Sequence, residues 1–334
     1  MREDPIFITG VYRSGTTFIS NILNAHPLLN VSYDTVNYFR FILKKGIAPH
    51  NYTDIVSNIN SRLNKRYNII LNGDRIVQEI QESAIINHKV IYSAVMNSLF
   101  GYSNKRWGEK ALLEWTNIPT FLSMFSIGKA IHLIRDPRDV LASYKNMTVE
   151  TGEKYLDAIF ATMHSMDTAI IYQQNFSCER YCILKYEDLV TDTRGAVQKM
   201  CIFLDLDFCE EMLIPNNYKD RHGKKFNCKG HSAYKENSYE ESSPLGRWKT
   251  ELSKFEIDFT ESLLSKQMKY FNYQLSDNYK ENNIAELLSI FDKTPLLKER
   301  VKNYLNTGTG VESYPSDPTL PQNWDTSKVM PKIL

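Results

Sequence analysis

The chain of 334 residues begins with an apolar run, a glycine-containing loop and an amphipathic segment in direct succession. "PIFITG" (5–10) has the composition of a buried strand, and "GVYRSGTTF" (10–18) overlaps its end. "TTFISNILNAHP" then spaces its apolar residues as on one helix face, and Pro27 stops the pattern. A loop between a strand and a helix N-terminus presents backbone N–H groups to an anion. This succession favours an α/β fold with an anion site beyond the strand.

The loop lacks the most familiar residue of an NTP-binding loop. The spacing from Gly10 to Gly15 is that of G-x-x-x-x-G-K-[ST], but Thr16 stands in the lysine position and Arg13 comes earlier. We expect an anion to be held by the Arg13 guanidinium together with hydroxyls and backbone N–H groups. The residues that would supply those N–H groups are Ser14, Gly15, Thr16 and Thr17. An ordinary strand-to-helix turn with a capping hydroxyl remains the alternative.

Two further apolar runs extend the pattern. "KAIHLI" (129–134) predicts a second strand, and "YCILKYEDLV" (181–190) predicts a third. "KRWGEK" (105–110) is a short strand or a loop. After the second strand, Asp136 and Pro137 stand in the N-cap and first positions of a helix. Strands that alternate with helices predict one doubly wound parallel sheet with helices on both faces.

The helical segments are read from their periodicity and their breaks. Residues 36–100 are helical and polar, with interruptions at Gly46–Pro49 and Asn72–Gly73, and form a helical insertion. The other expected helices lie at 118–125, 136–147, 151–175 and 193–206, with two short ones after residue 276.

Composition excludes several classes of protein. Forty basic against thirty-nine acidic residues give a net charge of +1, which argues against a general nucleic-acid binder. The five cysteines are scattered and predict neither a disulfide framework nor a zinc site, so reduced thiols are expected. No apolar run is long enough to span a membrane, and the N-terminus has no signal-peptide pattern. We expect a cytoplasmic protein.

A second motif, "RDPRDVLAS", follows the strand at 129–134. Arg135 sits at the strand end and Ser143 lies two turns into the next helix. The strand–R-S-G-T-T–helix and strand–R-D-P-R-D-x-x-x-S–helix pair resembles the sulfotransferases that use 3′-phosphoadenosine-5′-phosphosulfate (PAPS), in the branch with tyrosylprotein, carbohydrate and many bacterial enzymes. "LKYEDLV", with Tyr186, and "LGRWKTEL", with Gly246, Trp248 and Lys249, are similar to two later family segments. The resemblance covers roughly residues 5 to 275.

The resemblance implies the donor and its contacts. The first loop, from Arg13 to Thr17, would cradle the 5′-phosphosulfate, while Arg135 and Ser143 would hold the 3′-phosphate. Tyr186 would lie by the adenine. A terminal sulfonate carries less charge than a triphosphate, so the missing lysine and the absence of a metal-binding strand are consistent with a PAPS reaction that needs no metal. The product would be adenosine 3′,5′-bisphosphate.

The resemblance also implies the catalytic groups. In the branch named above, a carboxylate soon after the A-H-P segment acts as the base, and that position falls on Asp34; Lys110 in "GEK" matches the second catalytic cation. The alternatives are a helix N-cap for Asp34 and a surface position for Lys110. The reserve bases are Glu109, Glu114 and His231. We expect His26 to cap or pack at the end of the first helix, and His132 to be a hydrogen-bonded core residue.

Three features depart from the family pattern, namely the R-K-G segment, Tyr12 and the residues after Asp34, and the basic segment 219–235 has two possible roles. The R-K-G contact to the 3′-phosphate is missing, because Pro244 and Leu245 stand there, and Lys224, Lys225 or Arg247 would substitute. The basic segment 219–235 would close over the cofactor, or it is simply a solvated run of charge. Tyr12 stands where relatives often have proline, and no nearby arginine follows Asp34.

We therefore expect a sulfotransferase domain over 1–275, with the insertion 36–100 on the acceptor side and a C-terminal extension over 276–334. Its acceptor would be a glycan, a tyrosine or phenol, or a small alcohol, and the oligomeric state stays open. A P-loop kinase or NTPase-like enzyme is the rival activity, and a non-catalytic nucleotide-binding protein is the rival without activity.

Overall fold

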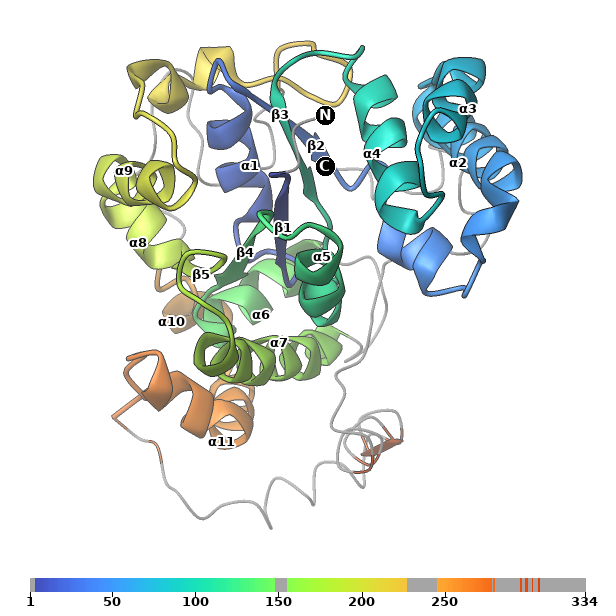
Figure 1. Cartoon of the computed structure of the whole chain (residues 1–334). Coiled ribbons are helices and arrows are strands. Elements are labelled where there is room, and N and C mark those ends of the chain that lie inside the picture. The colour runs from blue at the N-terminus through green and yellow to red at the C-terminus, as the bar shows by residue number, and fades with distance from the viewer. Residues whose placement is uncertain are drawn as a thin grey trace.

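The computed structural model describes residues 4–147, 155–226 and 245–277, with a few isolated positions beyond them. Five parallel strands form one sheet in the order β2-β3-β1-β4-β5 (Figure 1). The order reverses direction beside β1, as in a doubly wound sheet. The predicted fold class is therefore confirmed. The strands are β1 (Ile6–Gly10), β2 (Leu29–Tyr33), β3 (Arg106–Lys110), β4 (Lys129–Ile134) and β5 (Tyr181–Lys185).

The central strand β1 separates two apolar layers. Its alternate side chains Ile6 and Ile8 pack in the cluster that includes α1 (Thr16–Asn24), α8 (Tyr186–Thr191) and α9 (Thr193–Phe203). Phe7 points to the opposite face, where it stacks on Phe121 with ring centroids 5.0 Å apart. Figure 1 shows α1, α8 and α9 on one side of the sheet and α2–α4 on the other. Both faces of the sheet are thus covered, and β1 is buried along its whole length.

The insertion 36–100 is helical, with breaks near the predicted Gly46–Pro49 and Asn72–Gly73 and a further break at 82–87 that was not predicted. Asn72 and Asn87 cap two of its helices by accepting hydrogen bonds from the N–H groups of Arg75 and Val90. Its elements are a π-helical turn (Phe39–Leu43), a 3-10 turn (Pro49–Asn51), α2 (Tyr52–Tyr67), α3 (Gly73–Gln81) and α4 (His88–Leu99).

In the second half of the chain, α5 and α7 pack against β4, while α10 and α11 pack on α6 and α7. Residues of α6, α7 and α11 form a third buried apolar cluster, separate from the two clusters described above. These helices are α5 (Ile118–Met124), α6 (Pro137–Met147), α7 (Asp157–Asn175), α10 (Trp248–Glu251) and α11 (Lys254–Tyr270). The two short helices predicted after residue 276 fall outside the described residues, apart from isolated positions.

The structure differs from the sequence predictions at three points. The strand predicted over 181–190 ends at Lys185, because the next residues form α8, whose first turn carries Glu187 and Asp188 beside the positive end of the helix dipole. Strand β2 was not predicted, since "LNVSY" has no clear alternation. The long helix begins at Asp157 rather than 151, and residues 151–154 lie outside the described part of the chain.

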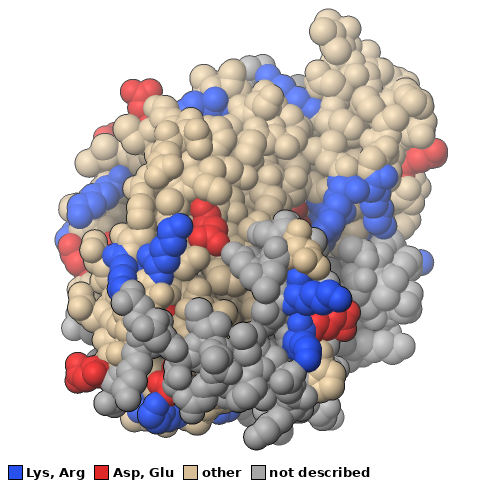
Figure 2. All heavy atoms as spheres, turned by 90° about the horizontal axis from the view of Figure 1, so that it is seen from below, with Lys and Arg blue, Asp and Glu red and all other residues tan. Residues whose placement is uncertain are grey.

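The surface agrees with the balanced charge. On the face that Figure 2 shows, the basic side chains lie in separate groups with acidic ones among them. Among the described helices, none is both long enough and apolar enough to cross a membrane.

Candidate active site

Within residues 4–147, the loop between β1 and α1 leaves the N-terminus of α1 without a side-chain cap, so an anion could approach it closely. Gly15 is the N-cap of α1 with φ at 96°, and within this described segment no side chain caps the helix. The backbone N–H and the hydroxyl of Ser14 both donate to the carbonyl of Val11, at 3.3 and 2.7 Å, which closes the turn. The N–H groups at Gly15, Thr16 and Thr17 therefore begin a helix dipole that favours an anion.

The two sequence motifs meet in space. Arg13 Nε donates to Ser143 Oγ on α6 at 2.8 Å, and Arg135 Nη1 donates to the carbonyl of Arg13 at 2.8 Å. Asp136 Oδ1 accepts from the N–H of Arg138 at 2.9 Å, as expected of the α6 N-cap. The ends of β1 and β4, which are neighbouring strands, thus place both motifs at one edge of the sheet.

Three guanidinium groups share this edge. Burial lowers the pKa of Arg13, and the nearby charges of Arg135 and Arg247 lower it further. Arg247 also forms an ion pair with Glu251, with Nε and Oε1 2.7 Å apart. Like charges gathered in a half-buried place repel one another, so this arrangement favours binding of a multiply charged anion.

Tyr186 fills the space over the loop. A Cβ added to Gly15 would lie 2.2 Å from the Tyr186 ring, so glycine is required there both for its φ and for its lack of a side chain. The Arg135 guanidinium lies 4.3 Å from the centre of the same ring. Tyr186 therefore joins the first loop to Arg135; its contact with an adenine stays a prediction.

Asp139 fastens a distant segment to α6. Its carboxylate accepts from the backbone N–H of Gly246 at 2.8 Å and from that of Trp248 at 3.1 Å. The Arg138 guanidinium lies 3.8 Å from the centre of the Trp248 ring. Lys249 is exposed. Nothing local to Asp139 in the sequence signals these partners, which lie 107 and 109 residues away.

Asp34 and Lys110 form the second part of the site. Asp34 directly follows β2, and Lys110 is the last residue of β3, which pairs with β2. The Lys110 ammonium donates to Asp34 Oδ2. Asp34 Oδ1 accepts from the N–H of Leu112 at 2.9 Å, while the Lys110 side chain is 4% exposed and that of Asp34 is 27% exposed. A surface position for Lys110 is therefore wrong. The N-cap role for Asp34 is also wrong, because Glu109 accepts the N–H groups of Val36 and Asn37.

An aromatic and two arginines stand beside Asp34. The Tyr67 hydroxyl donates to the Asp34 carbonyl at 3.0 Å and accepts from Arg66 Nε at 2.6 Å. The Arg221 guanidinium lies 3.8 Å from the centre of the Tyr67 ring. Arg221 belongs to the basic segment 219–235, of which the structure describes residues 219–226. Arg221 therefore packs on Tyr67, whose hydroxyl bonds the Asp34 backbone. Closure of the segment over a cofactor stays a prediction, as do roles for Lys224 and Lys225.

The reserve bases have structural partners. Glu109 is fully buried and accepts a hydrogen bond from the Tyr92 hydroxyl, and burial raises its pKa to about 7. Glu114 is buried in an ion pair with Arg40 Nε, with the two atoms 2.7 Å apart. His231 lies outside the described residues.

His26 and His132 hold structural positions. His26 Nε2 lies 2.9 Å from the carbonyl of Asp207, and His26 Nδ1 accepts from the N–H of Leu28. His132 bonds the hydroxyls of Tyr181 and Ser165, as expected of a core residue. Across residues 4–147, 155–226 and 245–277, no group of three or more His, Cys, Asp and Glu side chains is placed to hold a metal ion.

Comparison with known proteins identifies relatives for most of the chain. Residues 5–210 match the model described as "Sulfotransferase family". A protein named as a protein-tyrosine sulfotransferase from Caenorhabditis briggsae is 26% identical over 217 residues, which are 63% of this chain and 69% of the relative.

Two solved structures share the fold. One is the sulfotransferase domain of the Synechococcus PCC 7002 olefin synthase, with a TM-score of 0.57 and 19% identity over 82% of this chain and 96% of that domain. The other is the sulfotransferase domain of the curacin biosynthetic pathway, with a TM-score of 0.55 and 21% identity over 82% of this chain and 99% of that domain.

Proposed function

The chain belongs to the sulfotransferase family, and we propose that it moves the sulfonate of PAPS onto an acceptor hydroxyl with Asp34 as the base and Lys110 and Arg13 as the cations. The observation that carries this proposal is the meeting of Arg13, Ser143 and Arg135 at the N-terminus of α1. Hydrogen-bond donors from two strand ends converge there on the place where a phosphosulfate would lie.

The residues fit a nucleotide with two separate anionic groups. The α1 N-terminus, with the Thr16 and Thr17 hydroxyls and Arg13, would hold the 5′-phosphosulfate. Arg135 and Ser143 would hold the 3′-phosphate. Arg247 stands between Gly246 and Trp248, whose N–H groups bond Asp139 on α6, so we propose it as the replacement for the missing R-K-G contact, with Trp248 and Lys249 beside it. We propose Tyr186 as the neighbour of the adenine.

The reaction is an in-line displacement at sulfur. Asp34 takes the acceptor hydroxyl proton as the acceptor oxygen forms its bond to sulfur. The bond between sulfur and the bridging oxygen of the 5′-phosphate breaks, and the electron pair stays on that oxygen. Lys110, Arg13 and the loop N–H groups stabilise the negative charge that develops there. Adenosine 3′,5′-bisphosphate leaves, and the acceptor leaves as a sulfate ester.

The ion pair of Asp34 and Lys110 would orient the base before the reaction begins. Lys110 and the Leu112 N–H hold the carboxylate in place from two directions, and this fixes its orientation before an acceptor arrives. As the bridging oxygen gains negative charge, the Lys110 ammonium would donate one of its hydrogen bonds to that oxygen. One lysine would thereby serve both the base and the leaving group.

A binding and transfer experiment tests the proposal. Adenosine 3′,5′-bisphosphate should bind with submillimolar Kd in the presence of EDTA, measured by calorimetry, and labelled PAPS should transfer its label to hydroxyl acceptors. Asp34→Asn and Lys110→Ala should each lower kcat/KM about 10²-fold or more. Asp258→Asn, which removes an exposed ion pair with Lys254, is the matched control and should change little.

Two results would refute it. Binding of ATP with Mg²⁺ but not of the bisphosphate would assign the chain to a P-loop kinase or NTPase type. Unchanged function in both active-site variants would assign it to a non-catalytic nucleotide-binding role.

A further inference from the structure

The backbone of Asp34 is held from two sides. Its φ is 43°, in the left-handed region that is unfavourable for a residue with a side chain, so neighbouring groups must keep it there. Its N–H donates to the carbonyl of Lys110 on β3 at 2.7 Å. Its carbonyl accepts from the hydroxyl of Tyr67 on α2 at 3.0 Å. The conformation of the proposed base therefore depends on the insertion as well as on the sheet.

Helix α2 also holds the residues that follow the base. The buried Arg62 donates from Nη2 to the carbonyl of Val36, and its guanidinium lies 4.0 Å from the centre of the Phe41 ring. From the side of the sheet, Glu109 accepts the N–H of Val36 at 2.9 Å. Val36 is thus fixed by groups other than Tyr67, and the Tyr67 hydroxyl acts on the base itself.

Two guanidinium groups act on Tyr67. Arg66 Nε donates to its hydroxyl at 2.6 Å, and a hydroxyl that accepts from a cation is polarised into a stronger donor toward the Asp34 carbonyl. The Arg221 guanidinium lies 3.8 Å from the centre of its ring and restricts the ring from that face. The position of the hydroxyl therefore depends on Arg221, which lies 154 residues further along the chain.

Arg221 belongs to a short hairpin that docks beside the base. Residues 218–226 form this antiparallel hairpin. The hydroxyl of Tyr33, the residue directly before the base, donates to the carbonyl of Lys219 at 2.9 Å. The Tyr33 ring also stacks on that of Phe226, with centroids 6.4 Å apart. The hairpin thus touches the end of β2 directly and reaches the backbone of the base through the ring that Arg221 contacts.

We propose that Tyr67 is a positioning residue for Asp34, and that the hairpin 218–226 acts on the base through it. This inference rests on the proposed function. Without the Tyr67 hydroxyl, the left-handed backbone of Asp34 would relax and its carboxylate would leave the Leu112 N–H. A displaced carboxylate no longer lies where the acceptor hydroxyl presents its proton, so the proton transfer slows.

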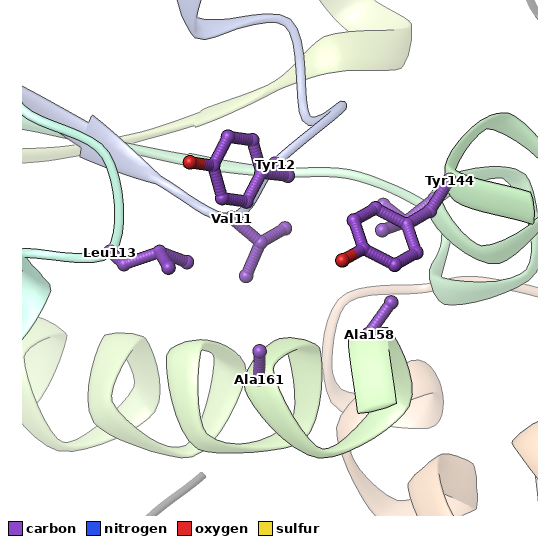
Figure 3. Close-up of a pocket in the computed structure, with 7 residues that line it drawn as sticks. Val11, Tyr12, Leu113, Tyr144, Ala158 and Ala161 are labelled. Carbon is purple, nitrogen blue, oxygen red and sulfur yellow. The ribbon is translucent and has the colours of Figure 1, made fainter. Parts of the chain in front are cut away.

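The Leu112 N–H reports the position of the base, because it donates to that carboxylate. Its chain neighbour is held independently: the N–H of Leu113 donates to the carbonyl of Gly10 at 3.1 Å. The Leu113 side chain packs in the same apolar cluster as Val11 and Ala161, and Figure 3 shows Leu113 and Val11 facing Ala161 of α7. Faster hydrogen exchange at Leu112 with its neighbours unchanged would therefore mean that the carboxylate has moved.

Amide hydrogen exchange, measured by NMR on the full chain, tests the inference. Tyr67→Phe keeps the ring and removes the hydroxyl, so it should raise the exchange rate of the Leu112 N–H about tenfold. The N–H of Val36, which Glu109 holds, should stay within about twofold. Arg221→Ala should raise the Leu112 rate about threefold, because a cation–π contact at a half-buried site is weaker than the hydrogen bond.

Hydrolysis of labelled PAPS to sulfate and adenosine 3′,5′-bisphosphate gives a kinetic readout with water as the acceptor. Tyr67→Phe should lower its kcat about tenfold and leave KM for PAPS within about twofold, since Tyr67 holds the base and not the nucleotide. Tyr52→Phe is the matched control, because it removes a hydroxyl from the same helix whose partner is the exposed amide of Gln81. It should change neither readout.

The outcomes separate the inference from the proposed function. Unchanged Leu112 exchange in Tyr67→Phe or in Arg221→Ala, an equal rise at Val36, or an unchanged kcat in Tyr67→Phe would overturn the inference and leave the proposed function standing. Failure of the wild-type chain to bind adenosine 3′,5′-bisphosphate would instead reject the proposed function.

Discussion

The carboxylate of Asp139 holds the backbone of Trp248 across 109 residues of chain, with Oδ1 3.1 Å from the Trp248 nitrogen. The same carboxylate accepts from the Gly246 N–H through its other oxygen. Both acceptor atoms are needed, because two N–H donors face one carboxylate. Asp139 thereby fixes the turn that carries Arg247 close to Arg13 and Arg135.

Asp139→Asn should loosen this turn and weaken nucleotide binding. An asparagine keeps one acceptor oxygen but presents an NH₂ group to the second N–H donor, so one hydrogen bond is replaced by a donor–donor contact. A loss of about 1.4 kcal/mol corresponds to about a tenfold rise in the Kd of adenosine 3′,5′-bisphosphate. Calorimetric titration measures it. Glu82→Gln, on an exposed carboxylate of the insertion, is the control, and an unchanged Kd in Asp139→Asn would show that the turn does not position the nucleotide.

The Asp34–Lys110 pair should also contribute to stability. Asp34→Asn leaves the Lys110 ammonium buried without its carboxylate, and we expect the free energy of unfolding to fall by about 1–3 kcal/mol, less than for a fully buried pair because Asp34 is partly exposed. The double variant Asp34→Asn/Lys110→Met should recover part of this loss, since neither charge remains. Urea unfolding of the single and double variants gives the comparison. Additive losses in the double variant would mean that the two side chains do not stabilise each other.

Local signals predicted the two helix starts that frame the first half of the candidate site. The helix-like spacing after Gly15 and the Asp136–Pro137 cap needed no distant contact, and both helices form where these signals placed them. Residue order alone also brought Arg13, Arg135 and Ser143 to one sheet edge, because β1 and β4 are parallel neighbours. Those features were predictable because each depends on residues close in sequence or on a general rule of parallel sheets.

Other features depend on contacts that the sequence does not display. Strand β3 is buried along its whole length although it contains Arg106, Glu109 and Lys110. Arg106 is tolerated there because it donates to the distant carbonyls of Asp4 and Leu204. The hydrogen bond from the Trp248 N–H to Asp139 likewise joins residues far apart in the sequence. Burial of charge is favourable only once such partners are in place, and a single sequence does not show which residues they are.

Glu109 should make stability depend on pH. Burial raises its folded-state pKa from 4.5 to about 7, so between these values the folded protein binds a proton that the unfolded chain has released. The contribution of this group to the free energy of unfolding therefore falls as pH rises from about 4.5 to 7, by a total of about 3 kcal/mol. Glu109→Gln should remove this part of the slope, because glutamine still accepts the N–H groups of Val36 and Asn37 and does not titrate.

Chemical denaturation at a series of pH values checks this dependence. The difference in free energy of unfolding between Glu109→Gln and wild type should grow in favour of the variant from pH 5 to pH 7.5. A constant difference over that range would contradict a raised folded-state pKa at Glu109.

Two glycines allow the Tyr186 contact to be separated from backbone strain. Gly15 and Gly46 both have positive φ, at 96° and 64°, but an added Cβ meets the Tyr186 ring at Gly15 and nothing within 4 Å at Gly46. Gly46→Ala should therefore cost only about 1 kcal/mol in the free energy of unfolding, the usual penalty of a left-handed alanine. Gly15→Ala should cost more and should also raise the Kd of adenosine 3′,5′-bisphosphate about tenfold or more, because the displaced ring disturbs both the loop and Arg135. Thermal unfolding and calorimetry on the two variants make the comparison, and equal effects of both on Kd would rule out a role for the Tyr186 contact in shaping the site.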